Sequence, residues 1–441
     1  MPKRFTELLA EITPKANCKY SVVNVRSSAR ETKPLVSAPS RSERPRTLKI
    51  EHLIVVCQDG IPFFALEVYV YLSLYNDRVE RLVFVSKADT TGLLSKRGGD
   101  GIKIKDIVKV ALKWILKYPI ETYVESAHLK RRQADADSVH TEVSPELCHT
   151  YQSATQRVLH ALVVKARGLS KPKPVKPQNK DLVVPKNQIT KLCLFTRAEP
   201  QYLFPGSDQN HSKHVLSGDK LLKWWADIVD GLVAETFSEI DQLKINIPGA
   251  EPRTVERTFG KTGSWKVGDI FSANNASSSD LAVHRIPLLP DDPKGRFLEH
   301  LVVENRIKKV SISQFWVELA IRQEFRLGIT VGVIGAVGKV RPSEGIYTTE
   351  VALTKAELQN VKDLLIERDY SDVSSAKEFS ERVSQDERIS LEFFTGNREP
   401  SKAVNQPNAE TQVNAVLTVR KRPKSEQVNS LNNFIRKKPK N

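Results

Sequence analysis

The stretch from Leu53 to Ser86, LIVVCQDGIPFFALEVYVYLSLYNDRVERLVFVS, decides the fold. Its aromatic and β-branched runs favour strands in the middle of a sheet. Asp59-Gly60 lies between two apolar runs and predicts a hairpin turn. We therefore expect the ordered part of the chain to begin with hairpin strands.

Helices and further strands are expected downstream. KDIVKVALKWILKYP (105–119) and GDKLLKWWADIVDGLVAETF (218–237) carry apolar residues at helical spacing. RLGITVGVIGAVGKV (326–340) is a Gly-spaced apolar run that favours a strand. We predict a mixed α/β fold with further helices near 296–308, 313–325, 354–368 and 375–394 and short strands in WKVGDIF (265–271) and LAVHRIPLL (281–289).

Composition divides the chain into segments. Residues 1–45 end in a polar stretch and are expected to form a loosely held N-terminal arm, ahead of a main domain over 46–397. Residues 126–187 are predicted to be a basic, partly disordered insertion, because LSKPKPVKPQNK cannot pack, although 144–168 could form a helix. Residues 398–441 are predicted to be a basic, disordered tail suited to nuclear import or electrostatic docking.

Bulk properties exclude several classes of protein. The 441 residues are 40% hydrophobic, and no apolar stretch reaches the roughly 18 residues that a membrane span needs. Four scattered cysteines and the absence of HExxH spacing predict a reduced intracellular protein without a metal site. A net charge of +16 implies polyanionic or acidic partners.

Three motifs are candidates for chemistry. PLLPDDPKGRF (287–297) places two adjacent acids before a lysine, which suits either a helix start or acid–base chemistry. SKADTTGLLSKRGGDGIKIKD (86–106) could hold phosphates or be a surface turn, because neither a Walker motif nor GxGxxG is present. The pair Trp224 and Trp225 could pack in the core or border a pocket.

Three long segments together resemble one family. FFALEVYVYLSLYNDRVERLVFVSKADTTG (63–92), LCLFTRAEPQYLFPGSDQNHSKHVLSGDKLLKWWADIVDGL (192–232) and IPLLPDDPKGRFLEHLVVENRIKKVSISQFWVELAIRQEF (286–325) are similar to the fungal-specific histone H3 lysine acetyltransferases, in the same order over most of 46–330. The resemblance implies a central mixed β-sheet surrounded by helices, as in the acetyltransferases of the CREB-binding-protein and GNAT type. It also implies acetyl-CoA as co-substrate and no metal.

The resemblance also assigns roles to residues of this chain. Around the cofactor it places Ala88, Asp89, Thr90, Gly101, Ile102, Lys103, Ile104, Lys105, Phe195, His214, Val215, Leu216 and Trp224. In catalysis it places Asp292, Asp291, Asp89, Trp225 and Tyr202. Lys294 resembles the self-acetylated lysine of the family. The Gly-rich loop before residue 105 is longer here than in the family.

A direct transfer in a ternary complex is expected, because no cysteine lies in a motif suited to an acyl-enzyme. Near pH 7.4 a lysine amine with a pKa of about 10.4 must lose its proton at a cost of about 4 kcal/mol. An aromatic channel around Tyr202 and Trp225 disfavours the ammonium, and Asp292 could accept the proton or position the lysine.

Partners follow from the resemblance as well. It implies newly made histone H3 with H4, histone chaperones of the NAP and anti-silencing-function families, and a nuclear location in replication-coupled nucleosome assembly. Neither a membrane nor direct binding to nucleic acid is required. The alternative is a non-catalytic basic module that binds nucleic acid or acidic histone chaperones.

Overall fold

The computed structural model describes residues 3–15, 18–37, 44–94, 101–127, 184–259, 265–272, 280–322, 330–342 and 352–399. Contacts between residues divide the chain into Met1–Pro400 and Ser401–Asn441, and the fold below is that of the first unit. The helix expected at 144–168, most of the insertion 126–187 and the tail from 400 onward lie outside the described residues.

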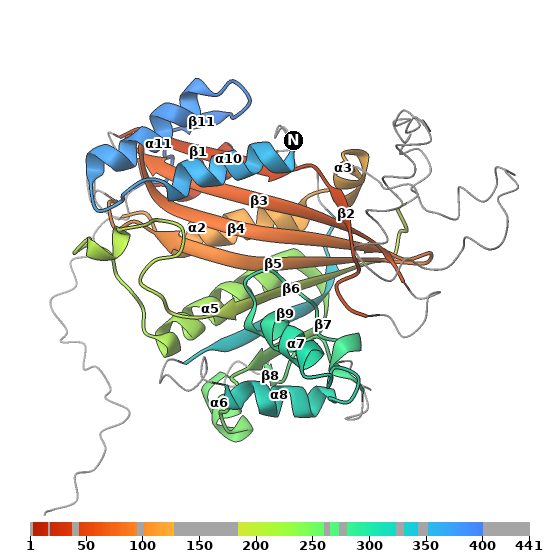
Figure 1. The fold of residues 1–441 in the computed structure, drawn as a ribbon. Coiled ribbons are helices and arrows are strands. Elements are labelled where there is room, and N and C mark those ends of the chain that lie inside the picture. The colour runs from red at the N-terminus through yellow and green to blue at the C-terminus, as the bar shows by residue number, and fades with distance from the viewer. Residues whose placement is uncertain are drawn as a thin grey trace, which may run out of the picture. The chain divides into compact units, whose positions relative to one another are not determined.

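One mixed sheet organises the first unit (Figure 1). Its main path runs β10-β1-β3-β4-β5-β6-β9-β7-β8, with β11 also paired to β1 and β2 to β3. The pairings are antiparallel except β1/β10, β5/β6 and β7/β8. The strands are β1 (Tyr20–Ser27), β2 (Arg30–Thr32), β3 (Arg46–Gln58), β4 (Ile61–Leu74), β5 (Val79–Thr90), β6 (Gln188–Thr196), β7 (Phe237–Asn246), β8 (Lys266–Val267), β9 (Gly332–Val340), β10 (Ala352–Leu353) and β11 (Leu391–Phe394). The expected mixed sheet is confirmed, as is the hairpin at Asp59-Gly60, where the φ angles are 51° and 80°.

The N-terminal residues belong to the sheet. All eight residues of β1 are buried, and Tyr20 to Arg26 pair with β3. The prediction of a loosely held arm over 1–45 is therefore wrong for this part. β1 also pairs with β11, near the other end of the described chain, and this pairing is not visible in the local sequence.

Helices cover both faces of the sheet. The expected helices are confirmed in position, apart from the region after Gln385: the predicted helix over 375–394 ends there, and 391–394 form β11. The segment 281–289 is no strand, because it holds only a 3₁₀ turn at Ala282–His284 and an isolated bridge from Leu281 to Ser311. The α-helices are α1 (Phe5–Ile12), α2 (Ile104–Lys117), α3 (Ile120–Glu125), α5 (Gly218–Thr236), α6 (Pro252–Phe259), α7 (Pro293–Val303), α8 (Ile312–Ile321), α10 (Lys355–Ile366) and α11 (Val373–Gln385).

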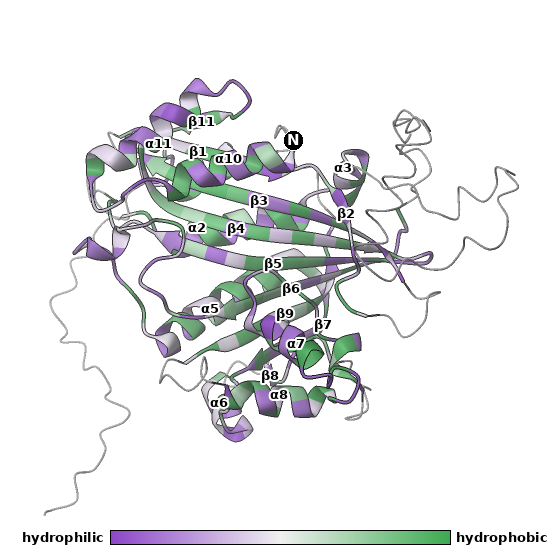
Figure 2. Cartoon of the chain, in the orientation of Figure 1, coloured by the Kyte–Doolittle hydropathy of each residue, from purple (hydrophilic) through white to green (hydrophobic). Residues whose placement is uncertain are grey.

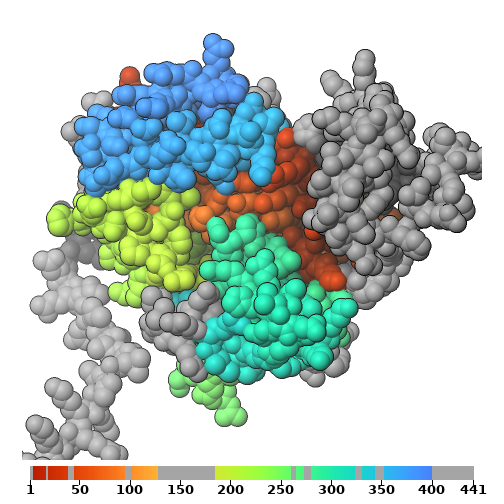
Figure 3. Space-filling model, in the orientation of Figure 1, coloured from red at the N-terminus to blue at the C-terminus, as the bar shows by residue number. Residues whose placement is uncertain are grey.

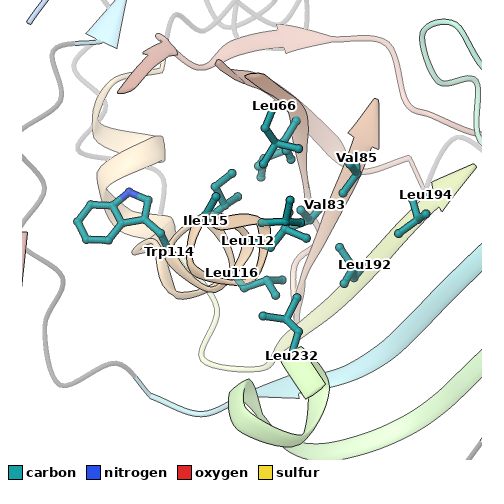
Figure 4. Packing of buried hydrophobic residues seen from close by; sticks show 14 of the residues in the cluster. Leu66, Val83, Val85, Leu112, Trp114, Ile115, Leu116, Leu192, Leu194 and Leu232 are labelled. Carbon is teal, nitrogen blue, oxygen red and sulfur yellow. The ribbon is translucent and has the colours of Figure 1, made fainter. Parts of the chain in front are cut away.

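The main core lies between the sheet and helices α2 and α5. Val83 and Val85 of β5 and Leu192 and Leu194 of β6 meet these helices there (Figure 4). The opposite face carries α10 and α11 over β1, β3 and β4, and α7 near β5 and β6. Figure 2 shows the strands mostly hydrophobic, whereas α10 and α7 show both kinds of residue, as helices between a core and solvent do.

Candidate active site

Two neighbouring parallel strands part at their carboxyl ends. β5 and β6 pair from Val79/Gln188 to Val85/Leu194, and there the pairing between them ends. Beyond this point β5 continues against β4 as far as Thr90, and β6 continues against β9 as far as Thr196. The carboxyl ends of parallel strands are where α/β sheets bind ligands, because the chain diverges there and leaves backbone groups for a ligand. Ala88, Thr90 and Phe195 lie on these diverging ends.

A β-bulge in β5 comes directly after this point. Lys87 is paired with Glu67 of β4 but Val85 with Val68, so Ser86 is an extra residue without a partner. A bulge of one residue shifts the side-chain alternation and turns the following side chains to the other face.

The consequence of the bulge is visible in the packing. Val85 and Ala88 both contact the core on the α2 side, although an uninterrupted strand would direct them to opposite faces. Lys87 and Asp89 therefore lie on the face that carries α10 and α7. The bulge places the predicted active-site carboxylate Asp89 on that face.

Asp89 organises the loop after β6. Its Oδ2 accepts hydrogen bonds from the backbone N–H groups of Tyr202, Leu203 and Phe204, at 2.7, 2.9 and 3.2 Å. Its Oδ1 lies 2.8 Å from Nζ of Lys213, and both side chains are 5% exposed. Asp89 thereby fixes the backbone beside the predicted catalytic Tyr202.

Asp292 begins helix α7 and is paired with a lysine. It is the N-cap, its Oδ1 accepts from the backbone N–H of Lys294 at 3.0 Å, and Pro293 occupies the first turn. Nζ of Lys294 lies 2.7 Å from Oδ1 and 2.6 Å from Oδ2. Both side chains are buried, and Nζ also lies 5.7 Å from the centre of the Phe195 ring. The helix-start interpretation of this motif is confirmed. The motif also contains a buried carboxylate whose charge is balanced by Lys294.

Asp291 differs from its neighbour. Its φ of 53° places it in the left-handed region, and its side chain is 66% exposed. Nζ of Lys87 donates to its Oδ2 at 2.8 Å, and this hydrogen bond is the main cause that lowers the pKa of Asp291 below its usual value.

The two tryptophans lie on α5, on the other side of the sheet. Trp225 is buried in the core with α2, and Trp224 packs against the same core from a less buried position. Their ring centres are 5.1 Å apart at an interplanar angle of 83°. The start of this helix is pressed against the segment before β9, since a Cβ on Gly218 would lie 2.3 Å from the carbonyl oxygen of Thr330.

The other predicted residues surround the parting strands. Tyr202 is 39% exposed and its hydroxyl donates to the carbonyl oxygen of Arg197 at 2.8 Å. His214 and Val215 are exposed on the segment that leads into α5, and Leu216 is half-buried. Residues 101–103 lead into α2, whose N-cap is Lys103, and 104 and 105 begin this helix; the preceding 95–100 lie outside the described residues.

The sequence of the chain matches one protein family over most of its length. The sequence model of the histone acetyltransferase KAT11-type domain matches residues 5–386. The chain belongs to the KAT11-type histone acetyltransferases. It is therefore a histone lysine acetyltransferase, and the alternative of a non-catalytic basic module is not supported.

Individual relatives agree with this family. The chain is 36% identical to the histone acetyltransferase RTT109 of Candida albicans over 296 residues, which are 66% of this chain and 76% of the relative. It is 33% identical to the histone acetyltransferase rtt109 of Schizosaccharomyces pombe over 155 residues, 32% of this chain and 39% of the relative. The crystal structure of Rtt109 from Aspergillus fumigatus superposes with a TM-score of 0.62 at 20% identity, covering 90% of this chain and all of that one, and supports the fold.

Three residues of the site were not predicted from the sequence: Lys213, Lys87 and Glu67. Glu67 had a usable signal, because it is the one charged residue within the apolar strand 61–74. Lys87 had none, because its direction depends on the bulge. Within the described ranges we find neither a cluster of three metal-ligating side chains nor a helix suited to crossing a membrane.

Proposed function

We propose that this histone acetyltransferase modifies lysine side chains of newly synthesised histone H3, presented with H4 by histone chaperones of the NAP and anti-silencing-function families, in the nucleus during replication-coupled nucleosome assembly. The observation that carries the assignment of the active site is the pairing of Asp292 with Lys294 next to the strand ends that bear Asp89 and Phe195. The histone and chaperone identities rest on the resemblance of the three sequence segments.

The acetyl donor fits the parting strands. Acetyl-CoA supplies an activated acyl group as a thioester when it is bound. The backbone of Ala88, Asp89 and Thr90 would hold the pantetheine arm, since these residues lie beyond the last pair of β5 with β6. Phe195 and Trp224 would contact the cofactor, as would 214–216. The N-terminus of α2, with 101–105, would face the phosphates, because backbone N–H groups and the helix dipole attract anions there.

Removal of a proton from the substrate lysine is the task left to the chain's own residues. The ring of Tyr202 and, from the α2 side of the parting strand ends, Trp225 would exclude water from the amine, which disfavours the ammonium. Asp89 contributes by holding the backbone at Tyr202 in place. Asp291 is exposed and ionised near neutral pH, so it can attract and orient the incoming lysine.

The state of Lys294 would set the availability of Asp292. While Lys294 is an ammonium, its Nζ donates to Oδ1 of Asp292 and forms an ion pair with Oδ2, and this positive charge opposes the transfer of a proton to the carboxylate. Acetylation of Lys294 would remove the positive charge and leave a carboxylate able to accept a proton, directly or through water. Self-acetylation at Lys294 is therefore part of the proposal.

Acetylation of H3 is tested with the purified full-length chain, acetyl-CoA and H3–H4, with and without an acidic histone chaperone of each family. Intact-mass measurement of H3 should show added acetyl groups, more with a chaperone than without. Peptide mapping of the enzyme should show acetyl-Lys294. Unmodified H3 in every mixture would contradict the proposed substrate.

Binding of the donor is tested separately by thermal shift. Acetyl-CoA should raise the melting temperature, whereas ATP and NAD should not, because only a ligand that prefers the folded protein stabilises it. An equal shift with all three would contradict the proposed cofactor site.

A further inference from the structure

A row of alternating charges crosses the sheet from helix α10 to the turn before α7. Lys362 of α10 contacts both Glu51 of β3 and Glu67 of β4. Lys87 of β5 lies 3.8 Å from Oε2 of Glu67 and 2.8 Å from Oδ2 of Asp291. In Figure 3 the strands that bear these residues show between α10 and α7.

Glu67 is the buried centre of this row. Its side chain is 3% exposed, and the hydroxyl of Tyr69 also donates to Oε1 at 3.2 Å. A buried carboxylate costs several kcal/mol unless it is paired, and Glu67 has Lys362 at Oε1 and Lys87 on the side of Oε2. Burial lowers the pKa of Lys362, but attraction to Glu67 and Glu51 outweighs this and raises the pKa above its usual value. This keeps Lys362 charged and leaves Oε2 of Glu67 facing Lys87.

Asp291 needs such a support. It has a left-handed backbone and a mostly exposed side chain, so packing does not fix its carboxylate. Among the described residues, Asp291 forms one ion pair within 4 Å, and its partner is Lys87. The direction of Lys87 is in turn set by the bulge at Ser86 and by Glu67.

We propose that Lys87 is a positioning residue of this acetyltransferase: anchored on Glu67, it holds the carboxylate of Asp291 where the substrate lysine enters. The proposal rests on the proposed role of Asp291 in the active site. Lys87 acts through Asp291 and does not touch the reacting atoms.

The test is a double-mutant cycle with the full-length enzyme, H3–H4 and chaperone. Lys87→Met should lower kcat/KM for the histone about tenfold, since loss of orientation alone has effects of this size or more, with KM for acetyl-CoA unchanged. Asp291→Asn should have a similar effect, and the double variant should be no worse than the poorer single variant, because both act through one carboxylate. Lys87→Arg should restore most of the activity, as its guanidinium can still donate to Asp291.

A matched control exists on the same sheet. Lys191 of β6 is 28% exposed, as Lys87 is, and its Nζ donates to Oε2 of Glu80 at 2.8 Å. Neither Lys191 nor Glu80 belongs to the proposed site. Lys191→Met should leave kinetics unchanged. If Lys87→Met is poorly folded, Lys87→Gln preserves a hydrogen-bond donor of shorter reach and should be intermediate.

Two results would overturn the inference in different ways. Asp291→Asn could lose activity while Lys87→Met keeps wild-type kinetics, or the two effects could multiply in the double variant. Either result would show that Lys87 does not position Asp291, and the proposed active site would stand. Wild-type kinetics in Asp291→Asn would show that Asp291 has no role in the active site, and the proposed role of Lys87 would then be wrong as well.

Discussion

Lys294 neutralises Asp292 inside the protein. Its Nζ lies 2.6 Å from Oδ2, and the two side chains are 2% and 0% exposed. Such a pair adds little to stability as a whole, because desolvation offsets attraction, but removal of one partner leaves a buried charge. The pair is thus costly to break, whether by substitution or by acetylation of Lys294, since either change leaves the carboxylate of Asp292 without its cation.

Lys294→Met should lower the free energy of unfolding by about 3–5 kcal/mol, because the carboxylate of Asp292 stays buried without its cation. The double variant Asp292→Asn/Lys294→Met should lose less, since both charges are gone and Asn still caps α7. Urea denaturation followed by tryptophan fluorescence measures both. A loss in the double variant equal to or greater than that of Lys294→Met would show that the charge pair is not the cause.

Acid should destabilise the fold through His52. This residue is buried, its Nε2 lies 2.7 Å from the hydroxyl of Tyr123, and burial, helped by Arg26, lowers its pKa to about 3. In the unfolded chain the pKa is about 6.5, so below that pH the unfolded state binds a proton that the folded state does not. This group therefore removes stability as the pH falls below 6.5, with a slope that approaches about 1.4 kcal/mol per pH unit near pH 5.

The measurement for His52 is denaturation at pH 7.0, 6.0 and 5.0. His52→Gln should be less stable at pH 7 but should fall less steeply with acid than the wild type. His211→Gln, at an exposed position, serves as control and should keep the wild-type slope. Equal slopes in His52→Gln and the wild type would contradict the assignment.

The sequence predicts the elements of the site better than their directions. The hairpin at Asp59-Gly60 and the helix with Trp224 and Trp225 follow from turn chemistry and periodicity, which are local. The side of the sheet on which Asp89 lies does not, because one extra residue at Ser86 inverts the alternation and leaves no trace in the composition. Pairing of β1 with β11 is equally hidden, because β11 lies near the other end of the described chain.

The active-site motif shows the same limit. Asp292 was expected either to start a helix or to act in catalysis, and its structural role as N-cap is compatible with the second role. Its pairing with Lys294 depends on the burial of both by Phe195 and the sheet face, which two positions in a sequence do not reveal. Residues two apart on an extended N-cap can meet, but only the surrounding packing makes them do so.

Asp89 should stabilise the loop from Arg197 to Lys213 in addition to its role in the active site. Asp89→Ala removes the acceptor for three backbone N–H groups and leaves Lys213 without its carboxylate, so the loop from Arg197 to Lys213 should loosen. Trypsin should then cut after these two basic residues faster than in the wild type, and the free energy of unfolding should fall by about 3 kcal/mol. Asp269→Ala is the control, because Asp269 is also a buried acceptor of two backbone N–H groups. A wild-type cleavage rate in Asp89→Ala would show that Asp89 does not stabilise this loop, and a role in catalysis alone would be left.

Trp225 and Trp265 separate packing from function. Both are buried, at 5% and 7% exposure, and both lie in the core on the α2 side, but Trp225 alone contacts Trp224 near the proposed cofactor site. Replacement by Phe leaves a cavity in either case, so both variants should lose about 1–3 kcal/mol of stability. Trp225→Phe should also lower kcat about tenfold or more, since the lysine is then less well excluded from water and less well oriented, while Trp265→Phe should stay within about twofold of the wild type. Equal rates in the two variants at equal stability would place Trp225 in the core alone, and the aromatic lining of the lysine site would then have to come from Tyr202 and other residues.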